Sequence, residues 1–382
     1  MGESAGQSAV GSVTVGDVVG VVEAAYPPAL AASWDEVGLV CGDRAEQVRT
    51  VRVCVDVTDE VVDAAVADGI DLILAHHPLL LRGVTTVAAD TGKGRIIHRL
   101  IRNGIALLTA HTNADSARPG VSDALADLLG LVDTVPIDPV PVTPMDKWVV
   151  MVPEGNVEQV SEAMFAAGAG TIGEYRDCSW SVVGTGQFEP LENAAPTIGE
   201  IGMRTHVDEA RVEMVASRGI RRRVLAALRA AHPYEEPAFD VLELADLDSV
   251  VGIGRAGTLA EPVTLAEFTR RAASLLGTPA GVRAAGDPDR LLRTVAVCGG
   301  SGDSYLDTVG RLGVDAYLTA DLRHHPADEA LRIGGPALID AGHWATEFPW
   351  CAHAAALLAD QLGVVATVHD QPTDPFRIHS TG

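Results

Sequence analysis

Four short polar segments of the sequence carry the residues that could do chemistry. They are His76-His77, His111–Asp115, the glycine-rich Gly299–Gly302, and His343–Glu347. Each segment follows an apolar run typical of a buried strand, at 70–75, 105–110, 294–298 and 337–340. Because parallel sheets bind ligands beyond the carboxyl ends of their strands, we expect the four segments to meet in one crevice.

The side chains in these segments are suited to metal binding. Imidazole and carboxylate together suit Zn, Fe, Mn or Ni. His343 and Glu347 are four residues apart, so they share one face of a helix. His76 and His77 would point to opposite faces of a regular strand, but at a strand end their rings could serve two metals. Asp115 or Glu347 could bridge such a pair, because the ions of two-metal sites lie about 3.5–4 Å apart.

Each feature also has a plain structural interpretation. A lone His-His pair is more often structural or partly exposed than a ligand, and an H-x-x-x-E pair on a helix is commonly solvated. Asp115 alone would be a helix N-cap. Gly299–Gly302 could be an anion cradle of backbone N–H groups at a helix N-terminus, or simply a tight turn from strand to helix. Their common position at strand ends favours a site.

The elements that must position these residues alternate between strand and helix. We expect helices at 15–25, 94–103 and 121–129, and another helix that begins after a Thr58 N-cap and ends at Gly69. Strands are expected at 50–57, 70–75 and 105–110. This alternation predicts a parallel sheet with right-handed crossovers, and hence an α/β fold.

The last third of the chain repeats this scheme. Residues 294–318 align without a gap with residues 50–74, and nine of the 25 positions are identical, from Thr50/Thr294 to Leu74/Leu318. A His-His-Pro sequence then follows both copies, at 76–78 and at 324–326. We therefore predict two duplicated α/β halves that form one metal-binding domain.

The middle of the chain differs from both halves in the order of its expected strands and helices. Four prolines between 136 and 144 predict a linker. Beyond it we expect strands at 147–152, 178–187, 200–207 and 238–244 and helices at 157–167 and 217–231. This βαββαβ order predicts an inserted ferredoxin-like α+β domain at 146–246. The main domain is then discontinuous, 13–145 plus 247–382, after a disordered tail at 1–12.

Composition narrows the possible partners. The 28 Lys and Arg face 52 Asp and Glu, a net charge of −24, so extensive nucleic-acid binding is unlikely. The 47% hydrophobic content indicates a globular protein. Five scattered cysteines without C-x-x-C spacing fit reduced thiols in the cytoplasm. The sequence has no run of 18 apolar residues, so we expect no membrane span.

Five motifs, taken in order, resemble the NGG-interacting-factor-three-like family, the GTP cyclohydrolase I type 2 homologues. They are Trp34–Leu39 with Gly42, His76–Pro78, His111–Asp115, Leu318–Asp321 with His325, and Gly342–Glu347. The middle segment, ending in His232–Asp240, resembles the PII/CutA-like insert of the longer bacterial members. Glu36 stands where the family pattern has Asn, and Ala320 where it has Gly, but neither is an expected ligand.

This resemblance implies a dinuclear centre and an assembly. Two divalent ions (Zn, Fe or Mn) would be held by His76, His77, Asp115, His343 and Glu347. His111 and His325 would lie near the metals, as catalytic or supporting groups. The chain would form a toroidal homohexamer with its sites facing an internal cavity.

The implied activity is that of a metal-dependent hydrolase, GTP cyclohydrolase-like or phosphoesterase, acting on a nucleotide or phosphoester. The alternative is a non-catalytic metal-binding or regulatory scaffold.

Overall fold

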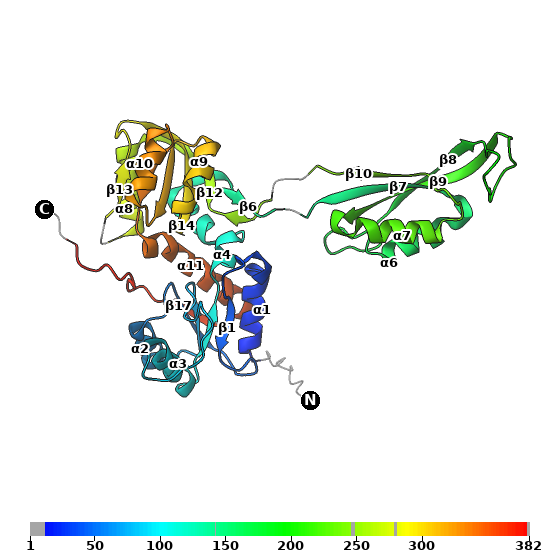
Figure 1. Cartoon of the computed structure of the whole chain (residues 1–382). Helices are drawn as coiled ribbons and strands as arrows, with labels where there is room; N and C mark the ends of the chain where they lie inside the picture. The colour runs from blue at the N-terminus through cyan, green and yellow to red at the C-terminus, as the bar shows by residue number, and fades with distance from the viewer. Residues whose placement is uncertain (1–11, 142, 246–248, 279–280, 380–382) are drawn as a thin grey trace, which may run out of the picture. The chain divides into compact units, whose positions relative to one another are not determined.

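The computed structural model describes residues 12–141, 143–245, 249–278 and 281–379. The chain divides into two compact units, Met1–Val140 with Ser249–Gly382, and Pro141–Asp248 (Figure 1). All but one residue of the tail expected at 1–12 lies outside the described residues. No helix in the described part of the chain is both long and apolar enough to cross a membrane.

The larger unit contains a five-stranded sheet ordered β1-β4-β3-β2-β17. Its strands are β1 (Gly38–Cys41), β2 (Thr50–Cys54), β3 (Leu72–Ala75), β4 (Ala106–Thr109) and β17 (Val365–Val368). β17, β2, β3 and β4 are parallel, and β1 runs antiparallel at the edge. Helices α2 (Asp59–Ala67) and α3 (Gly92–Arg102) bury their apolar residues against one face of this sheet. The parallel core that we predicted is therefore confirmed.

A six-stranded sheet in the same unit is ordered β13-β16-β15-β14-β12-β5. Its strands are β5 (Leu131–Val135), β12 (Arg255–Thr264), β13 (Arg283–Ala285), β14 (Leu291–Ser301), β15 (Ala316–Ala320) and β16 (Ala337–Asp340). Only β14, β15 and β16 are parallel. Helices α9 (Leu306–Leu312) and α10 (His324–Arg332) cover one face. A two-stranded sheet pairs β6 (Asp138–Pro139) with β11 (Gly252–Ile253).

One helix joins the two sheets into a single core. α11 (His343–Leu362) contacts β2 and β17 of one sheet and β14 and β15 of the other. Trp350 and Leu358 are fully buried on this helix. A fully buried leucine contributes about 2 kcal/mol through the hydrophobic effect. Helices α1 (Val15–Ala25), α5 (Val121–Leu129) and α8 (Leu265–Leu276) complete this core.

Two equivalent Thr–Asp pairs stabilise the starts of corresponding strands. The Thr50 backbone N–H donates to Asp71 Oδ2 at 3.0 Å, and the Asp71 N–H donates back to Thr50 Oγ1 at 3.0 Å. Thr294 and Asp315 make the same two bonds in the other sheet, at 2.9 and 3.1 Å. Each pair ties the start of one parallel strand to the turn before the next.

The smaller unit has the element order β7 (Met145–Pro153), α6 (Val157–Ala166), β8 (Trp180–Phe188), β9 (Thr205–Ser217), α7 (Arg221–Ala231) and β10 (Phe239–Glu243). Its four strands are ordered β10-β7-β9-β8, and all pairs are antiparallel. α6 and α7 pack on one face, over Trp148 and Val212.

The prediction of a strand at 200–207 was wrong, because the strand of the structure spans Thr205–Ser217. Its outward residues Glu209, Arg211 and Glu213 alternate with buried small and apolar residues, which is the period of two of a half-buried strand. The helix expected from 217 begins at Arg221, because Ser217 still belongs to this strand and Arg218–Ile220 form a short 3-10 helix.

Candidate metal centre

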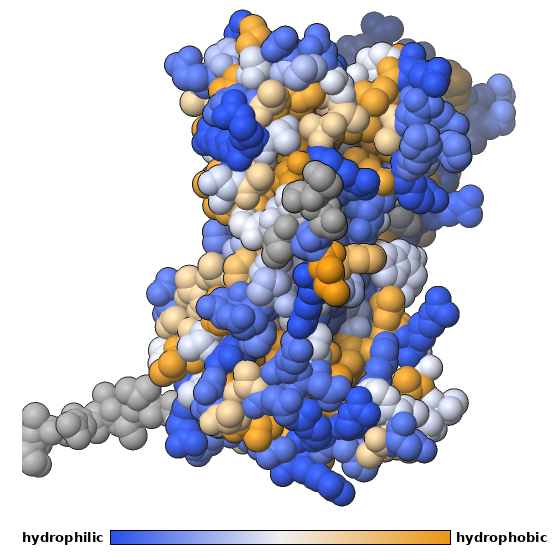
Figure 2. Space-filling view, turned by 90° about the vertical axis from the view of Figure 1, so that its left-hand side faces the viewer, coloured by the Kyte–Doolittle hydropathy of each residue, from blue (hydrophilic) through white to orange (hydrophobic). Residues whose placement is uncertain are grey.

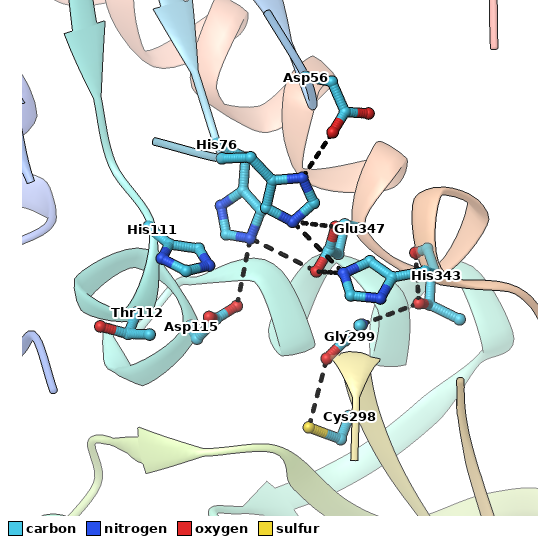
Figure 3. Close-up of polar contacts among 12 residues, drawn as sticks. Asp56, His76, His111, Thr112, Asp115, Cys298, Gly299, His343 and Glu347 are labelled. Atoms are coloured by element: carbon cyan, nitrogen blue, oxygen red, sulfur yellow. Dashed lines mark hydrogen bonds and ion pairs between the residues drawn. The ribbon is translucent and has the colours of Figure 1, made fainter. Parts of the chain in front are cut away.

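The two sheets bring their carboxyl ends together around the start of α11. His76 and His77 follow β3, and His111 and Asp115 follow β4, Asp115 on the short helix α4 (Thr112–Ser116). Beyond the second sheet, His343 and Glu347 lie in the first turns of α11 (Figure 3).

Glu347 is the centre of the cluster. Its side chain is 4% exposed. Its Oε1 lies 3.6 Å from His76 Nε2 and 3.2 Å from His343 Nε2, and its Oε2 lies 3.1 Å from His77 Nε2. Asp115 Oδ1 also lies near His76, at 3.7 Å from its Nε2. The five side chains implied as ligands by the sequence resemblance are therefore in one cluster. Figure 3 labels all of them except His77.

Each imidazole is held by its other nitrogen. The Nδ1 contacts are Ala110 O for His76 at 2.9 Å, Asp56 Oδ1 for His77 at 2.8 Å, Asp321 Oδ2 for His343 at 2.6 Å and Asp35 Oδ1 for His111 at 2.8 Å. Since each of these oxygens accepts a hydrogen bond, Nδ1 is the protonated nitrogen and Nε2 presents a lone pair in the neutral ring. This is the arrangement that orients metal-binding histidines in proteins.

The three carboxylates that hold these rings were not among the residues expected from the sequence. Asp35 and Asp321 lie within two of the motifs that carry the family resemblance, and Asp56 lies just before the Thr58 cap. Asp56 and Asp321 follow the ends of β2 and β15, where polar side chains are functional candidates, but Asp35 precedes β1 and has no such signal.

Electrostatics at the centre favour positive charge. Burial lowers the pKa of His77, but Glu347 and Asp56 outweigh it and raise the pKa to about 10. Burial likewise lowers the pKa of His343, and the bonds with Asp321 and Glu347 raise it to about 11. Without a cation, these sites therefore hold protons, which a metal ion would have to replace.

His111 and Asp115 differ from these two histidines. Burial and the neighbouring His76 lower the pKa of His111 to about 4, so its ring is neutral at pH 7. Burial raises the pKa of Asp115 to about 6, although His76 opposes this shift.

The residues present fit a bound metal. The donor atoms form two groups, His76–His77–His111 and His77–His343–Glu347, whose ligand atoms lie within 4.8 Å of one another. Within the described residues, His76 Nε2 is buried without a hydrogen-bond partner. Such an orphaned buried group is costly, and a cation would satisfy it.

Gly300 leaves room for this centre. A Cβ at this position would lie 2.2 Å from Glu347 Oε1 and 3.1 Å from His343 Nε2, and the φ of Gly300 is +63°. Both the space and the left-handed backbone require glycine. The Gly300 N–H donates to Thr346 Oγ1, and its carbonyl accepts from Thr319 Oγ1. This segment thus supports the ligand helix, and the Gly300 N–H is not available for an anion cradle.

His325 is not part of the cluster in this structure. It lies exposed at the start of α10, and its ring centroid is 5.2 Å from that of His324. Among the described residues, no metal-ligand group includes it.

A cavity of about 770 Å³ opens from the cluster. His77 and His343 form part of its wall, and the wall also includes the Arg283–Asp340 ion pair, with an N–O contact of 2.6 Å. The centre is therefore accessible to a small molecule.

Comparisons with known proteins define the family. Residues 13–375 match the family model Duf34/NIF3 (NGG1p interacting factor 3), and the chain belongs to this family. It is 56% identical over 376 residues to the GTP cyclohydrolase 1 type 2 homolog of Mycobacterium tuberculosis, covering 97% of this chain and 99% of the relative. The Bacillus subtilis homolog of the same name is 37% identical over 369 residues, covering 96% and 98%.

Solved structures agree on the fold. A Bacillus cereus protein related to NIF3 superposes with a TM-score of 0.67 at 36% identity, covering 96% of this chain and 99% of that one. Staphylococcus aureus protein SA1388 superposes with a TM-score of 0.77 at 29% identity, covering 97% and 100%.

Proposed function

We propose that this chain binds two divalent cations (Zn, Fe or Mn) and hydrolyses a nucleotide or another phosphoester. His76, His77, Asp115, His343 and Glu347 would hold the ions. The observation that carries the proposal is that Nε2 of three imidazoles, those of His76, His77 and His343, lies 3.1–3.6 Å from the Glu347 carboxylate, while each Nδ1 is held by another acceptor.

The accessible cavity supports catalysis over a purely structural role. Structural metal sites are closed, whereas catalytic sites keep positions open for water or substrate. When bound, divalent ions act as Lewis acids and lower the pKa of a bound water from 15.7 to about 7. The wall formed by His77 and His343 would expose such ions to a molecule in the cavity.

We propose that His111 is the group that moves a proton beside the centre. Asp35 holds its Nδ1 at 2.8 Å, and its side chain is 15% exposed. His325, exposed on α10, has no role in this proposal.

The relatives are named GTP cyclohydrolase 1 type 2 homolog, and this name suggests GTP as one substrate. Opening a purine ring requires activated water, and the same groups would serve phosphoester hydrolysis.

A substrate panel tests the proposal. Nucleotides and phosphoesters are incubated with the protein in excess Zn, Mn or Fe, and turnover is compared between wild type and His343→Ala. The matched control is His353→Ala, on the exposed face of the same helix. We expect turnover in wild type and His353→Ala only. Equal inactivity of wild type and His343→Ala with every metal would refute the proposal, and equal activity would mean contamination.

Bridging by Asp115 has its own test. If this carboxylate serves both ions, Asp115→Ala loses more than one ion per chain in metal analysis. Retention of one ion at full affinity would contradict bridging.

The second candidate is a non-catalytic metal-binding or regulatory scaffold. The smaller unit favours it, because that unit has its own hydrophobic core and contributes none of the proposed ligands. A protein that binds two ions tightly and turns over no compound of the panel would fit this alternative.

The finer features of the fold belong to the same proposal. We propose that the matching Thr–Asp pairs mark two duplicated halves, and that the strand order β10-β7-β9-β8 makes the smaller unit a ferredoxin-like, PII/CutA-like insert. Its expected bounds, 146–246, lie inside the compact unit Pro141–Asp248. We further propose a cytoplasmic, toroidal homohexamer. Analytical ultracentrifugation should then give six chains, and a monomer would contradict it.

A further inference from the structure

The segment after β17 returns to the metal centre. Thr373 is 7% exposed, and its Oγ1 donates to Asp56 Oδ2 at 2.5 Å. The other oxygen of Asp56, Oδ1, accepts from His77 Nδ1 at 2.8 Å. A chain of two hydrogen bonds therefore links Thr373 to a proposed metal ligand 296 positions earlier in the sequence.

A second contact holds this segment four residues further on. Arg377 pairs with Glu60 in the first turn of α2, with Nη1–Oε1 at 3.2 Å and Nη2–Oε2 at 2.8 Å. Between the two anchors, Asp374 Oδ1 accepts from the backbone N–H of Phe376 at 2.8 Å and closes a turn. The path of the segment from 373 to 377 is thus fixed at both ends.

The anchored segment forms one wall of the cavity beside the centre. Asp374, Pro375 and Phe376 line the same cavity as His77 and His343. The side of the larger unit on which this segment lies carries a mixture of hydrophobic and hydrophilic residues (Figure 2). A molecule in this cavity would therefore have both the segment and two of the proposed ligands in its walls.

We infer that Thr373 is a positioning residue for the proposed metal centre, acting on His77 through Asp56. A carboxylate that orients a ligand must itself be held, because it can otherwise rotate about its Cβ–Cγ bond. The Thr373 hydroxyl donates to Oδ2, the Asp56 oxygen that His77 does not contact, so both oxygens of Asp56 are held by a hydrogen bond. Loss of the carboxylate that holds a metal-binding histidine typically lowers metal affinity by about 10–100-fold, and releasing one oxygen of that carboxylate should cost the lower end of this range.

This inference rests on the proposed metal centre, and its test does not depend on turnover. The probe is Zn²⁺ alone, titrated against a competing chelator. Thr373→Val keeps the shape of the side chain and removes the hydroxyl, so we expect zinc to bind at least about tenfold more weakly at one of the two sites. Thr373→Ser keeps the hydroxyl and should bind zinc within about threefold of wild type.

Spectroscopy and a matched variant separate positioning from general loosening. Replacing zinc by Co²⁺, we expect the visible absorption bands of Thr373→Val to shift, while those of Thr373→Ser match wild type. Arg377→Gln releases the other anchor without contact to Asp56, and it should leave both zinc affinity and the Co²⁺ spectrum unchanged.

Three outcomes would overturn the inference: unchanged zinc affinity in Thr373→Val, an equal loss in Thr373→Ser, or an equal loss in Arg377→Gln. A wild type that binds zinc tightly but hydrolyses nothing would refute the proposed hydrolase activity. The zinc affinities of the Thr373 variants would then still decide whether Thr373 positions the centre. A wild type that binds no zinc, manganese or iron would overturn both.

Discussion

Replacing Glu347 by Gln is the most direct perturbation of the cluster. The substitution preserves size and removes one negative charge from a side chain that is 4% exposed. Its oxygens lie 3.1–3.6 Å from the Nε2 atoms of three imidazoles, and no other carboxylate in the described residues reaches all three. A cation at the centre would depend on this charge more than on any other.

The expected magnitude follows from that geometry. Two unit charges 4 Å apart interact by about 4 kcal/mol at an effective dielectric constant of about 20. Because 1.4 kcal/mol corresponds to a factor of ten in binding, we expect Glu347→Gln to weaken zinc binding by roughly a thousandfold. Both ions should be affected, because the two carboxylate oxygens face different histidines.

The assay is equilibrium dialysis against buffered zinc, followed by metal analysis. Glu261→Gln, an exposed substitution on β12, is the control for a changed net charge. Circular dichroism of each variant checks that the fold is retained. If Glu347→Gln kept both ions with affinity within about tenfold of wild type, the placement of Glu347 at the centre of the site would be refuted.

Two further predictions concern backbone space and acid stability. Gly300→Ala forces a Cβ against Glu347, so this variant should lose bound zinc. The control is Gly104→Ala, at a glycine with φ +64° and open space around it, which should lower stability only. Equal zinc content in the two variants would contradict the steric argument. In the smaller unit, the Arg221 hydrogen bonds hold the pKa of buried Asp146 below its ordinary value. This stabilisation is present above the unfolded pKa of about 3.9 and is lost as pH falls through the folded pKa. Asp146→Asn should therefore lower the free energy of unfolding by about 2 kcal/mol at pH 7, and the difference should close below about pH 4 in urea unfolding followed by tryptophan fluorescence; a constant gap at all pH values would refute this assignment.

Local signals predicted much of the larger unit. The helices expected at 15–25 and 121–129 have those bounds in the structure, and Thr58 caps α2 as expected, accepting from the Val61 N–H at 3.2 Å. These elements combine a capping residue with an apolar face of helical period, so sequence neighbours alone determine them. The ligand candidates could also be found from local sequence, because each polar segment directly follows an apolar run typical of a buried strand.

What escaped prediction depends on distant partners. Asp35 becomes important only because it meets His111, 76 residues away, and Asp56 because it meets both His77 and Thr373. Edge strands such as β1 and β13 are short and pair antiparallel to the core, which no local period reveals. His325 shares the His-His-Pro sequence of the first half, yet it begins a helix, where the first copy forms a strand end.

The order of the proposed ligands along the chain restricts when the proposed centre can be completed. His76, His77 and Asp115 precede the smaller unit, while His343 and Glu347 follow it, so Glu347 lies 232 positions after Asp115. During synthesis, the first three side chains emerge long before their partners exist. An ion that needs the full set cannot be captured by the growing polypeptide until α11 has been made and has docked between both sheets, which separates metal acquisition from early translation.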